Sequence, residues 1–303
     1  MKRNIYLVFV LISTCSFSQT LTDGLMMPKA DLCTGFMYTH DRWTDYWQGE
    51  LKRKNDNIGT VTTQSAMWVG IYGISKKFNA LVSLPYVWTK ASQGTLRPME
   101  GLQDVSVGVK YNFFTHKFEG SNFKAFGVLN FAMPVTDYTP DYLPLAIGSA
   151  STRLTWRLTT YYRLEQGWFA NASAGYTWRS NVTLDRPAHW DEDGLVNSTE
   201  AFLPNVFDLF VSAGFHKGAI QAELNYMQQN MFGGDDIRSQ VMPEVGNRMN
   251  YAKAGVLVMY YVPFPKGMAV RGAYSYTVSG RNVGQSTTLT AGLLYTIHFS
   301  KTE

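Results

Sequence analysis

The chain has 303 residues, enough for one large barrel or two ordinary domains, and its net charge of +4 is too small by itself to indicate nucleic-acid binding. Apolar residues make up 45% and aromatic residues 15%, while the charged fraction of 17% lies below the globular average of roughly 25%. Nothing in the sequence matches the ~20 consecutive apolar residues of a membrane-spanning helix. A membrane β-barrel distributes its apolar residues by alternation, so this composition is compatible with one.

The N-terminus has the three regions of a signal peptide. Lys2 and Arg3 precede the apolar run 5–12, and two serines stand on either side of Phe17. This order predicts a signal peptide over residues 1–18, cleaved before Gln19. The alternative is a buried N-terminal strand.

The two cysteines bear on processing and on disulfides. Cys15 suggests a lipoprotein signal, which Thr14 disfavours because a smaller residue usually precedes a lipidated cysteine. Removal of the signal peptide leaves Cys33 alone, so no intramolecular disulfide can form.

About twelve strands are predicted along the chain. The inward faces of the first, second and fifth cannot be assigned, because their apolar residues do not keep to one face. The predicted strands cover residues 32–38, 60–74, 78–88, 103–114, 123–133, 150–163, 168–178, 205–215, 220–226, 251–261, 268–278 and 287–299.

The fourth predicted strand, 103–114, has the clearest alternation. A period of two separates an apolar face from a polar face. In a soluble sandwich the apolar face would pack on a second sheet, whereas in an outer-membrane barrel it would meet lipid. The apolar face carries Val105, Val107, Val109, Tyr111 and Phe113, and the other carries Asp104, Ser106, Gly108, Lys110 and Asn112.

The predicted connections alternate in length. Long ones follow the odd-numbered strands, with 180–203 the longest, and short ones follow the even-numbered strands, such as Lys217-Gly218. Outer-membrane barrels have an even strand count, short periplasmic turns and long outer loops. A soluble sandwich gives no reason for such sorting. The pattern therefore favours a membrane barrel with both termini on the periplasmic side.

Strand 168–178 favours a membrane barrel over a soluble protein whose core is closed by aromatic residues. Its outward face has aromatic residues at both ends and alanines between them, and strand 78–88 has the same length and aromatic ends. Ten residues at ~3.3 Å each, tilted by ~40°, span ~25 Å, the height of the apolar band between two aromatic girdles. The outward residues are Trp168, Ala170, Ala172, Ala174, Tyr176 and Trp178.

Short motifs in the same region carry a resemblance to a known family. Gly101-Leu102-Gln103-Asp104 opens a strand that contains Gly108-Val109-Lys110-Tyr111, and the proline-rich stretch 134–148 follows the next strand. This arrangement resembles the outer-membrane proteins of the MetA-type phenol-degradation pathway, a group related to FadL-like transporters. Val135-Thr136 stands where a Thr-Gly pair is common, and the Asn-Pro-Ala of fatty-acid channels is absent. The resemblance implies a transporter for small aromatic or hydrophobic compounds and names no substrate.

Ten charged residues fall on the predicted inward faces, seven of them basic and three acidic. Rings of basic side chains favour anions in a pore, and Arg153 and Arg157 lie four residues apart on one face, where they could form a ladder. The equally supported alternative is an ion-paired interior that stabilises the barrel. These candidate pore-lining residues are Asp104, Lys110, Arg153, Arg157, Arg163, Arg179, Asp208, Glu223, Lys253 and Arg271.

Enzyme hypotheses have little support in the sequence. An outer-membrane phospholipase would need a serine two positions after a histidine, and of the five histidines only His298 has one, Ser300. His189 with Asp191 and Asp193 is the nearest match to an omptin-like protease, and a solvated loop explains it better. The spacing of an EF-hand is absent from this loop.

The sequence therefore predicts an all-β protein, an antiparallel transmembrane β-barrel of the outer-membrane type with about 12 strands. Residues 19–303 would form the barrel together with a short N-terminal periplasmic or plug segment at the start of this range. We expect an outer-membrane channel or transporter for passive uptake of small solutes, among them aromatic or hydrophobic compounds and organic anions. The lipid bilayer is the expected partner; no catalytic residue, cofactor, metal or nucleic acid is expected, and the solute and the oligomeric state stay open. The alternatives are a structural or interaction barrel that binds a partner through its outer loops and, less favoured, a lipid-modifying enzyme.

Overall fold

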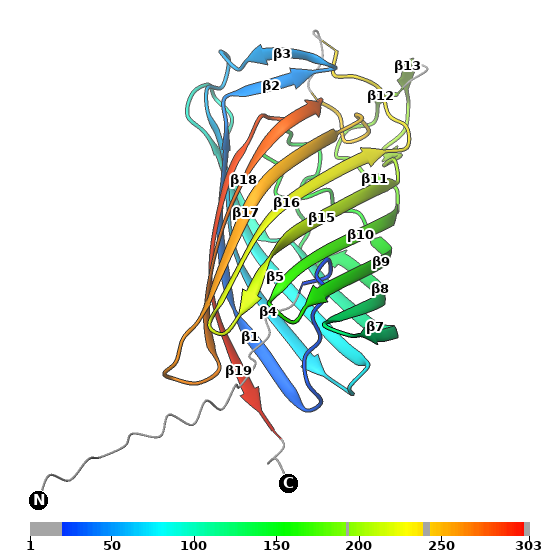
Figure 1. Cartoon of the computed structure of the whole chain (residues 1–303). Coiled ribbons are helices and arrows are strands. Elements are labelled where there is room, and N and C mark those ends of the chain that lie inside the picture. Colours follow the sequence, from blue (N-terminus) through cyan, green and yellow to red (C-terminus); the bar gives the residue numbers. More distant parts are fainter. Residues whose placement is uncertain (1–19, 192–193, 239–242, 300–303) are drawn as a thin grey trace, which may run out of the picture.

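A computed structural model describes residues 20–191, 194–238 and 243–299. Within them, twelve long antiparallel strands form one closed barrel, as predicted (Figure 1). Neighbours in sequence pair throughout the wall, and β1 closes it by pairing with both β4 and β19. The wall strands are β1 (Asp31–Trp43), β4 (Val61–Gly73), β5 (Phe78–Ala91), β7 (Asp104–Phe118), β8 (Ser121–Pro134), β9 (Arg153–Leu164), β10 (Trp168–Arg179), β15 (Val206–Lys217), β16 (Ile220–Met231), β17 (Asn250–Tyr261), β18 (Met268–Arg281) and β19 (Thr287–His298).

The described residues contain no helix long and apolar enough to cross a membrane.

The connections alternate in length as the sequence predicted. The long ones gather at one end of the barrel, and the short turns lie at the other end, where β1 begins and β19 ends (Figure 1). The last connection at the long-loop end, 282–286, is an exception, because it is shorter than the turn 262–267. Short strands occur in the long connections, where the sequence predicted plain loops. They are β2 (Asp45–Gln48), β3 (Leu51–Lys54), β6 (Met99–Leu102), β11 (Val182–Thr183), β12 (His189–Asp191), β13 (Gly194–Val196) and β14 (Glu200–Ala201).

Several wall strands are longer than predicted. β1 continues to Trp43, although the sequence predicted a loop from His40 onward. Residues 41–43 pair with β4, and residues 41 and 42 also pair with β19, without an apolar face. Backbone pairing needs no apolar side chains, so a strand can extend past the apolar band into its loop.

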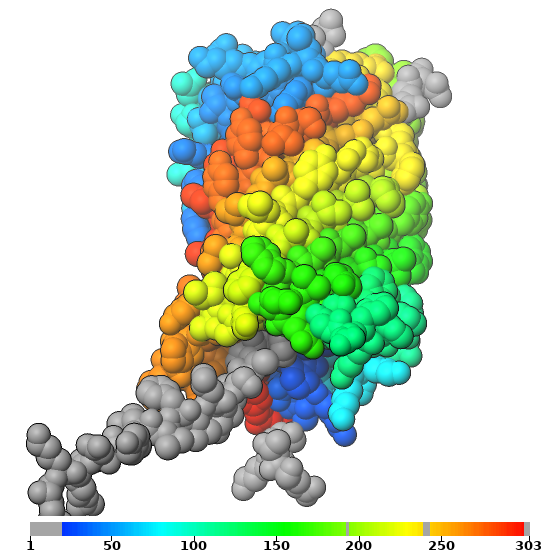
Figure 2. Space-filling model, in the orientation of Figure 1, coloured from blue at the N-terminus to red at the C-terminus, as the bar shows by residue number. Residues whose placement is uncertain are grey.

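The faces of β7 lie as predicted. Val107 and Tyr111 are exposed on the outside of the wall, whereas Asp104 and Lys110 are buried inside. A bulge between Asn112 and Phe114 adds one residue to the strand, and Phe114 is exposed like its neighbour. The space-filling view shows a continuous wall of side chains on the face it presents (Figure 2).

The structure also assigns the three strands whose facing the sequence left open. In β1, Phe36 is exposed on the outside and Cys33 is buried inside, while in β4 Trp68 is exposed and Ile71 is buried. In β8, Leu129, Phe131 and Met133 are exposed, and the inward Phe126 is fully buried. Their inward faces are partly apolar because they pack on a further segment of the chain.

That segment is the described N-terminal stretch, residues 20–30, which lies inside the barrel near the end with the short turns (Figure 1). Leu25 packs with Phe126, Tyr161 and Phe169. Met27 packs in a second cluster with the inward residues Cys33, Ile71, Leu81, Leu257, Met259, Ala269 and Leu294. These two clusters are the apolar core of this half of the barrel.

Candidate channel lumen

The ten charged residues singled out by the sequence lie on the interior side of the wall, and several form ion pairs across it. Arg153 donates a 2.5 Å hydrogen bond to Asp104, two strands away. The loop residue Tyr138 donates to the other oxygen of Asp104 at 2.5 Å. Burial and this hydrogen bond raise the pKa of Tyr138, so its hydroxyl stays a donor to the carboxylate.

Arg157 and Asp208 form the second pair, again between strands that are not neighbours. The Arg157 Nη2 atom lies 2.7 Å from one oxygen of Asp208 and 2.8 Å from the other. Gly175 lies on β10 between them, and a Cβ there would be 2.7 Å from Arg157 Nη2. A larger residue at position 175 would therefore displace the two side chains from this geometry.

Three further basic residues of the interior differ in their partners. Lys253 lies 3.6 Å from Asp41 and 3.3 Å from Thr288 Oγ1. Arg163, near the short turns, donates to the backbone carbonyl of His216 at 2.8 Å. Arg179 makes no ion pair with any described residue, and its Nε atom has no hydrogen-bond partner there. Arg153 and Arg157 are thus paired, whereas Arg179 is an unpaired cation.

Lys110 connects the wall to the N-terminal segment. Its ammonium is fully buried and donates to Asp23 Oδ1 at 2.9 Å, to the Asp23 carbonyl at 2.5 Å and to the Thr20 carbonyl at 3.2 Å. Asn171 of β10, three strands along the wall from β7, donates to the Thr22 carbonyl at 2.9 Å. Buried charges are tolerated when they are paired and hydrogen-bonded in this way.

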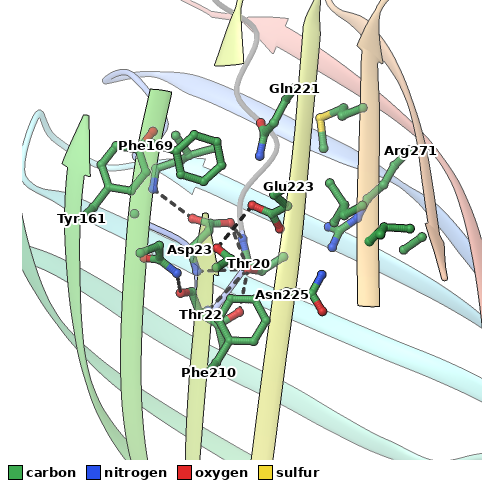
Figure 3. A pocket seen from close by; sticks show the side chains of 18 of the residues that line it. Thr20, Thr22, Asp23, Tyr161, Phe169, Phe210, Gln221, Glu223, Asn225 and Arg271 are labelled. Atoms are coloured by element: carbon green, nitrogen blue, oxygen red, sulfur yellow. Dashed lines mark hydrogen bonds between the residues drawn. The ribbon is translucent and has the colours of Figure 1, made fainter. Parts of the chain in front are cut away.

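A cavity of about 200 Å³ lies between this segment and strands β9, β10 and β15 to β18 (Figure 3). Glu223 and Arg271 both point into it. Phe169 and Phe210 line the same cavity, so it combines both signs of charge with aromatic rings.

A larger cavity of about 710 Å³ lies among the long connections, and it marks the mouth of the barrel at that end. Arg53, Arg238 and several asparagines contribute polar groups to its wall. Most of its lining is apolar or aromatic, with Trp43, Tyr46, Ile58, Leu96, Leu143 and Ile237 among its residues.

Three of the long loops meet at Arg186. Its guanidinium pairs with Asp141 of the β8–β9 loop, at 2.5 Å from Nε, and with Glu244 of the β16–β17 loop. Burial lowers the pKa of Arg186, but the hydrogen bonds to Glu244 and Asp141 together outweigh it, so the pKa is raised overall. The contacts join loops that are far apart in sequence.

The candidate protease residue His189 lies in the long loop between β10 and β15. His189 Nδ1 lies 3.1 Å from the Ser198 carbonyl and is buried in the loop, and Asp193 lies outside the described residues. The described residues include no group of three or more histidine, cysteine or acidic side chains arranged to hold a metal.

The N-terminal segment is the part of the lumen that sequence reasoning did not place. Thr20, Asp23, Leu25 and Met27 all contact the inner wall. One sequence feature could have placed this segment inside the barrel, namely the apolar run 25–27, shortly after the predicted signal peptide. A tail exposed in the periplasm would not need these apolar residues.

The chain was compared with known proteins. The family model described as "Putative MetA-pathway of phenol degradation" matches residues 60–293. An outer-membrane channel from Pseudomonas putida F1 has a similar structure, with a TM-score of 0.72 at 11% identity over 89% of this chain and 97% of that one. The NanC porin aligns with a TM-score of 0.49 at 10% identity, over 86% and 98% of the two chains. No curated protein sequence matches the chain. At these identities the likeness to the P. putida channel concerns the fold alone.

Proposed function

The chain belongs to this MetA-pathway family, and we propose that it is an outer-membrane channel for passive uptake of small solutes, among them aromatic or hydrophobic compounds and organic anions. The observation that carries the proposal is the mouth cavity, whose apolar and aromatic lining includes Trp43 and Tyr46. Apolar concave sites with a few polar groups are typical of small-molecule binding. A barrel that served only as a structural element would not need such a cavity at its mouth.

The proposed passage continues through the charged interior. Because Arg153 and Arg157 are paired with Asp104 and Asp208, the unpaired Arg179 is the residue to which we assign a preference for anions. A cation without a partner attracts anions and lowers their barrier in a pore. We also propose that the signal peptide is cleaved before Gln19. The mass of the N-terminal peptide of the purified protein tests this.

Conductance in planar bilayers tests the channel function. We expect the purified protein to conduct ions and proteoliposomes to take up small aromatic solutes. Arg179→Gln should shift the reversal potential in a salt gradient toward cations, whereas Arg42→Gln, an exposed arginine on β1, should not. A protein that inserts but neither conducts nor takes up solutes would be a structural or interaction barrel.

Replacing Trp43 with alanine tests the mouth cavity. Aromatic contacts contribute about 0.5–1.5 kcal/mol, so uptake of an aromatic solute at low concentration should fall by roughly 2- to 10-fold. The matched control is Trp156→Ala, which removes an indole from the outer face of the wall. If both substitutions lowered uptake equally, the mouth cavity would not be the site that controls uptake.

A further inference from the structure

Two opposite charges in the 200 Å³ cavity have no ionic partner. Glu223 accepts a hydrogen bond from Ser212 Oγ at 3.5 Å and forms no ion pair with any described residue. Arg271 likewise forms no ion pair within the described chain, and its Nε atom has no hydrogen-bond partner there. In every ion pair described above, by contrast, a guanidinium or ammonium nitrogen lies within 4 Å of a carboxylate oxygen. An unpaired charge inside a membrane protein is costly and marks a functional site.

The strand register explains why these two side chains face each other without touching. Gln221 of β16 pairs with Met259 of β17, and Met259 pairs with Arg271 of β18, so Arg271 lies in the same row as Gln221. Glu223 is two residues farther along β16, on the same face. In Figure 3 its carboxylate and the guanidinium of Arg271 point toward each other across the cavity. The two charges can therefore contact opposite ends of one small molecule.

The rest of the lining limits the size and chemistry of that molecule. Phe169 and Phe210 supply aromatic surface beside the charged pair. Asn171 Oδ1 is buried without a hydrogen-bond partner in the described chain, so it provides one more acceptor at the cavity wall. The volume of about 200 Å³ exceeds the roughly 150 Å³ of a protein cavity known to hold benzene, which leaves room for one ring with a small polar head.

We propose that this cavity binds a small zwitterion with one aromatic ring, that is, an aromatic α-amino acid, through Arg271 and Glu223. The carboxylate of the ligand pairs with the Arg271 guanidinium, and its ammonium pairs with Glu223. The ring lies against Phe169 and Phe210. Binding leaves the net charge of the site unchanged, because the ligand carries one positive and one negative group; Asp23, the third charged residue of the lining, is paired with Lys110. This ligand class goes beyond the proposed uptake of aromatic compounds and organic anions.

Equilibrium dialysis of the purified, detergent-solubilised protein tests the proposal with three probes of similar size. L-phenylalanine has both charges, 3-phenylpropanoate lacks the ammonium and 2-phenylethylamine lacks the carboxylate. A hydrogen bond to a charged group contributes about 1.5–3 kcal/mol, so each single-charge probe should bind the unmodified protein roughly 10- to 100-fold more weakly than L-phenylalanine. Equal binding of all three probes, or no binding of L-phenylalanine, would overturn the proposal.

Two substitutions assign the charges. Arg271→Gln should weaken L-phenylalanine and 3-phenylpropanoate by roughly 10-fold or more and leave 2-phenylethylamine unchanged, and Glu223→Gln should do the reverse. Arg42→Gln should leave all three unchanged. A uniform loss with both variants would contradict the assignment. Binding is measured without conductance, so a conducting barrel that ignores L-phenylalanine refutes this inference and leaves the proposed function standing.

Discussion

The two halves of the barrel interior have opposite chemistry, although the same strands form both. In the half near the termini, inward residues such as Phe126 and Met259 pack on the N-terminal segment. In the half near the long loops, inward residues form ion pairs such as Arg153–Asp104 and Arg157–Asp208. The half near the termini therefore contains packed apolar clusters beside the cavity of Glu223 and Arg271, whereas ion pairs between wall strands dominate the other half.

Individual strands show this change along their length. β9 carries Tyr161 near the short turns and Arg153 near the long loops. In the same way, β1 carries Cys33 near the short turns and Asp41 near the long loops. Burying apolar side chains gives a large and dependable stabilisation. Buried ion pairs add little net stability, because desolvation offsets their attraction. We therefore expect stability to depend on the half near the termini and selectivity on the half near the loops.

Phe126→Ala should have the largest effect, because it removes a fully buried ring from the packing around Leu25. The free energy of unfolding should fall by about 3–5 kcal/mol. Denaturant titration of the protein in lipid vesicles measures it. Phe131→Ala on the outer face of the same strand should cost much less, since its ring contacts lipid rather than a packed core. Similar losses would show that the N-terminal segment contributes little to stability.

Lys110→Met should have an intermediate effect at the junction of the two halves. It leaves the Asp23 carboxylate and the Thr20 carbonyl without their donor, which should cost about 1–3 kcal/mol. We also expect a higher open probability in planar bilayers, because the ion pair holds the segment inside the barrel. Lys117→Met, which changes an exposed lysine on the same strand, is the control. Unchanged conductance in a folded variant would mean that the segment stays in place without Lys110.

Arg186→Gln should have a small effect on global stability, about 1 kcal/mol or less, because its ion pairs join outer loops rather than the wall. The loops that contain Asp141 and Glu244 should be cleaved faster by protease. Timed proteolysis with mass spectrometry measures this, and the exposed Arg97 supplies the control variant Arg97→Gln. Cleavage at the wild-type rate would show that other contacts hold the loops together.

The smallest expected effect is a pH dependence at Asp236. Its carboxylate accepts two 2.8 Å hydrogen bonds from Arg281 and one from Asn282, which lower its pKa. A lowered pKa stabilises the folded state above the unfolded value of ~3.9, and this contribution is lost as the pH falls through the folded pKa. The side chain is 41% exposed, so solvent screening keeps the effect small.

The rates of amide hydrogen exchange in the β16–β17 loop, corrected for intrinsic rates, should therefore be equal at pH 7 and pH 5. They should be higher at pH 3. Asp236→Asn should remove the step below pH 4. A step of the same size in this variant would assign the pH dependence to another group.

The sequence by itself determined the strand number, the sorting of long and short connections and the lipid face of strands such as β7 and β10. A period of two shows which face meets lipid wherever the opposite face is polar. It could not decide β1, β4 and β8, because their inward residues, Phe126 among them, are apolar where they meet the N-terminal segment. It could not pair Arg153 with Asp104 either, since 49 residues separate them in the chain. Only the pairing register of β7, β8 and β9 brings those two side chains together, and the pairing of β16, β17 and β18 places Glu223 and Arg271 at one cavity.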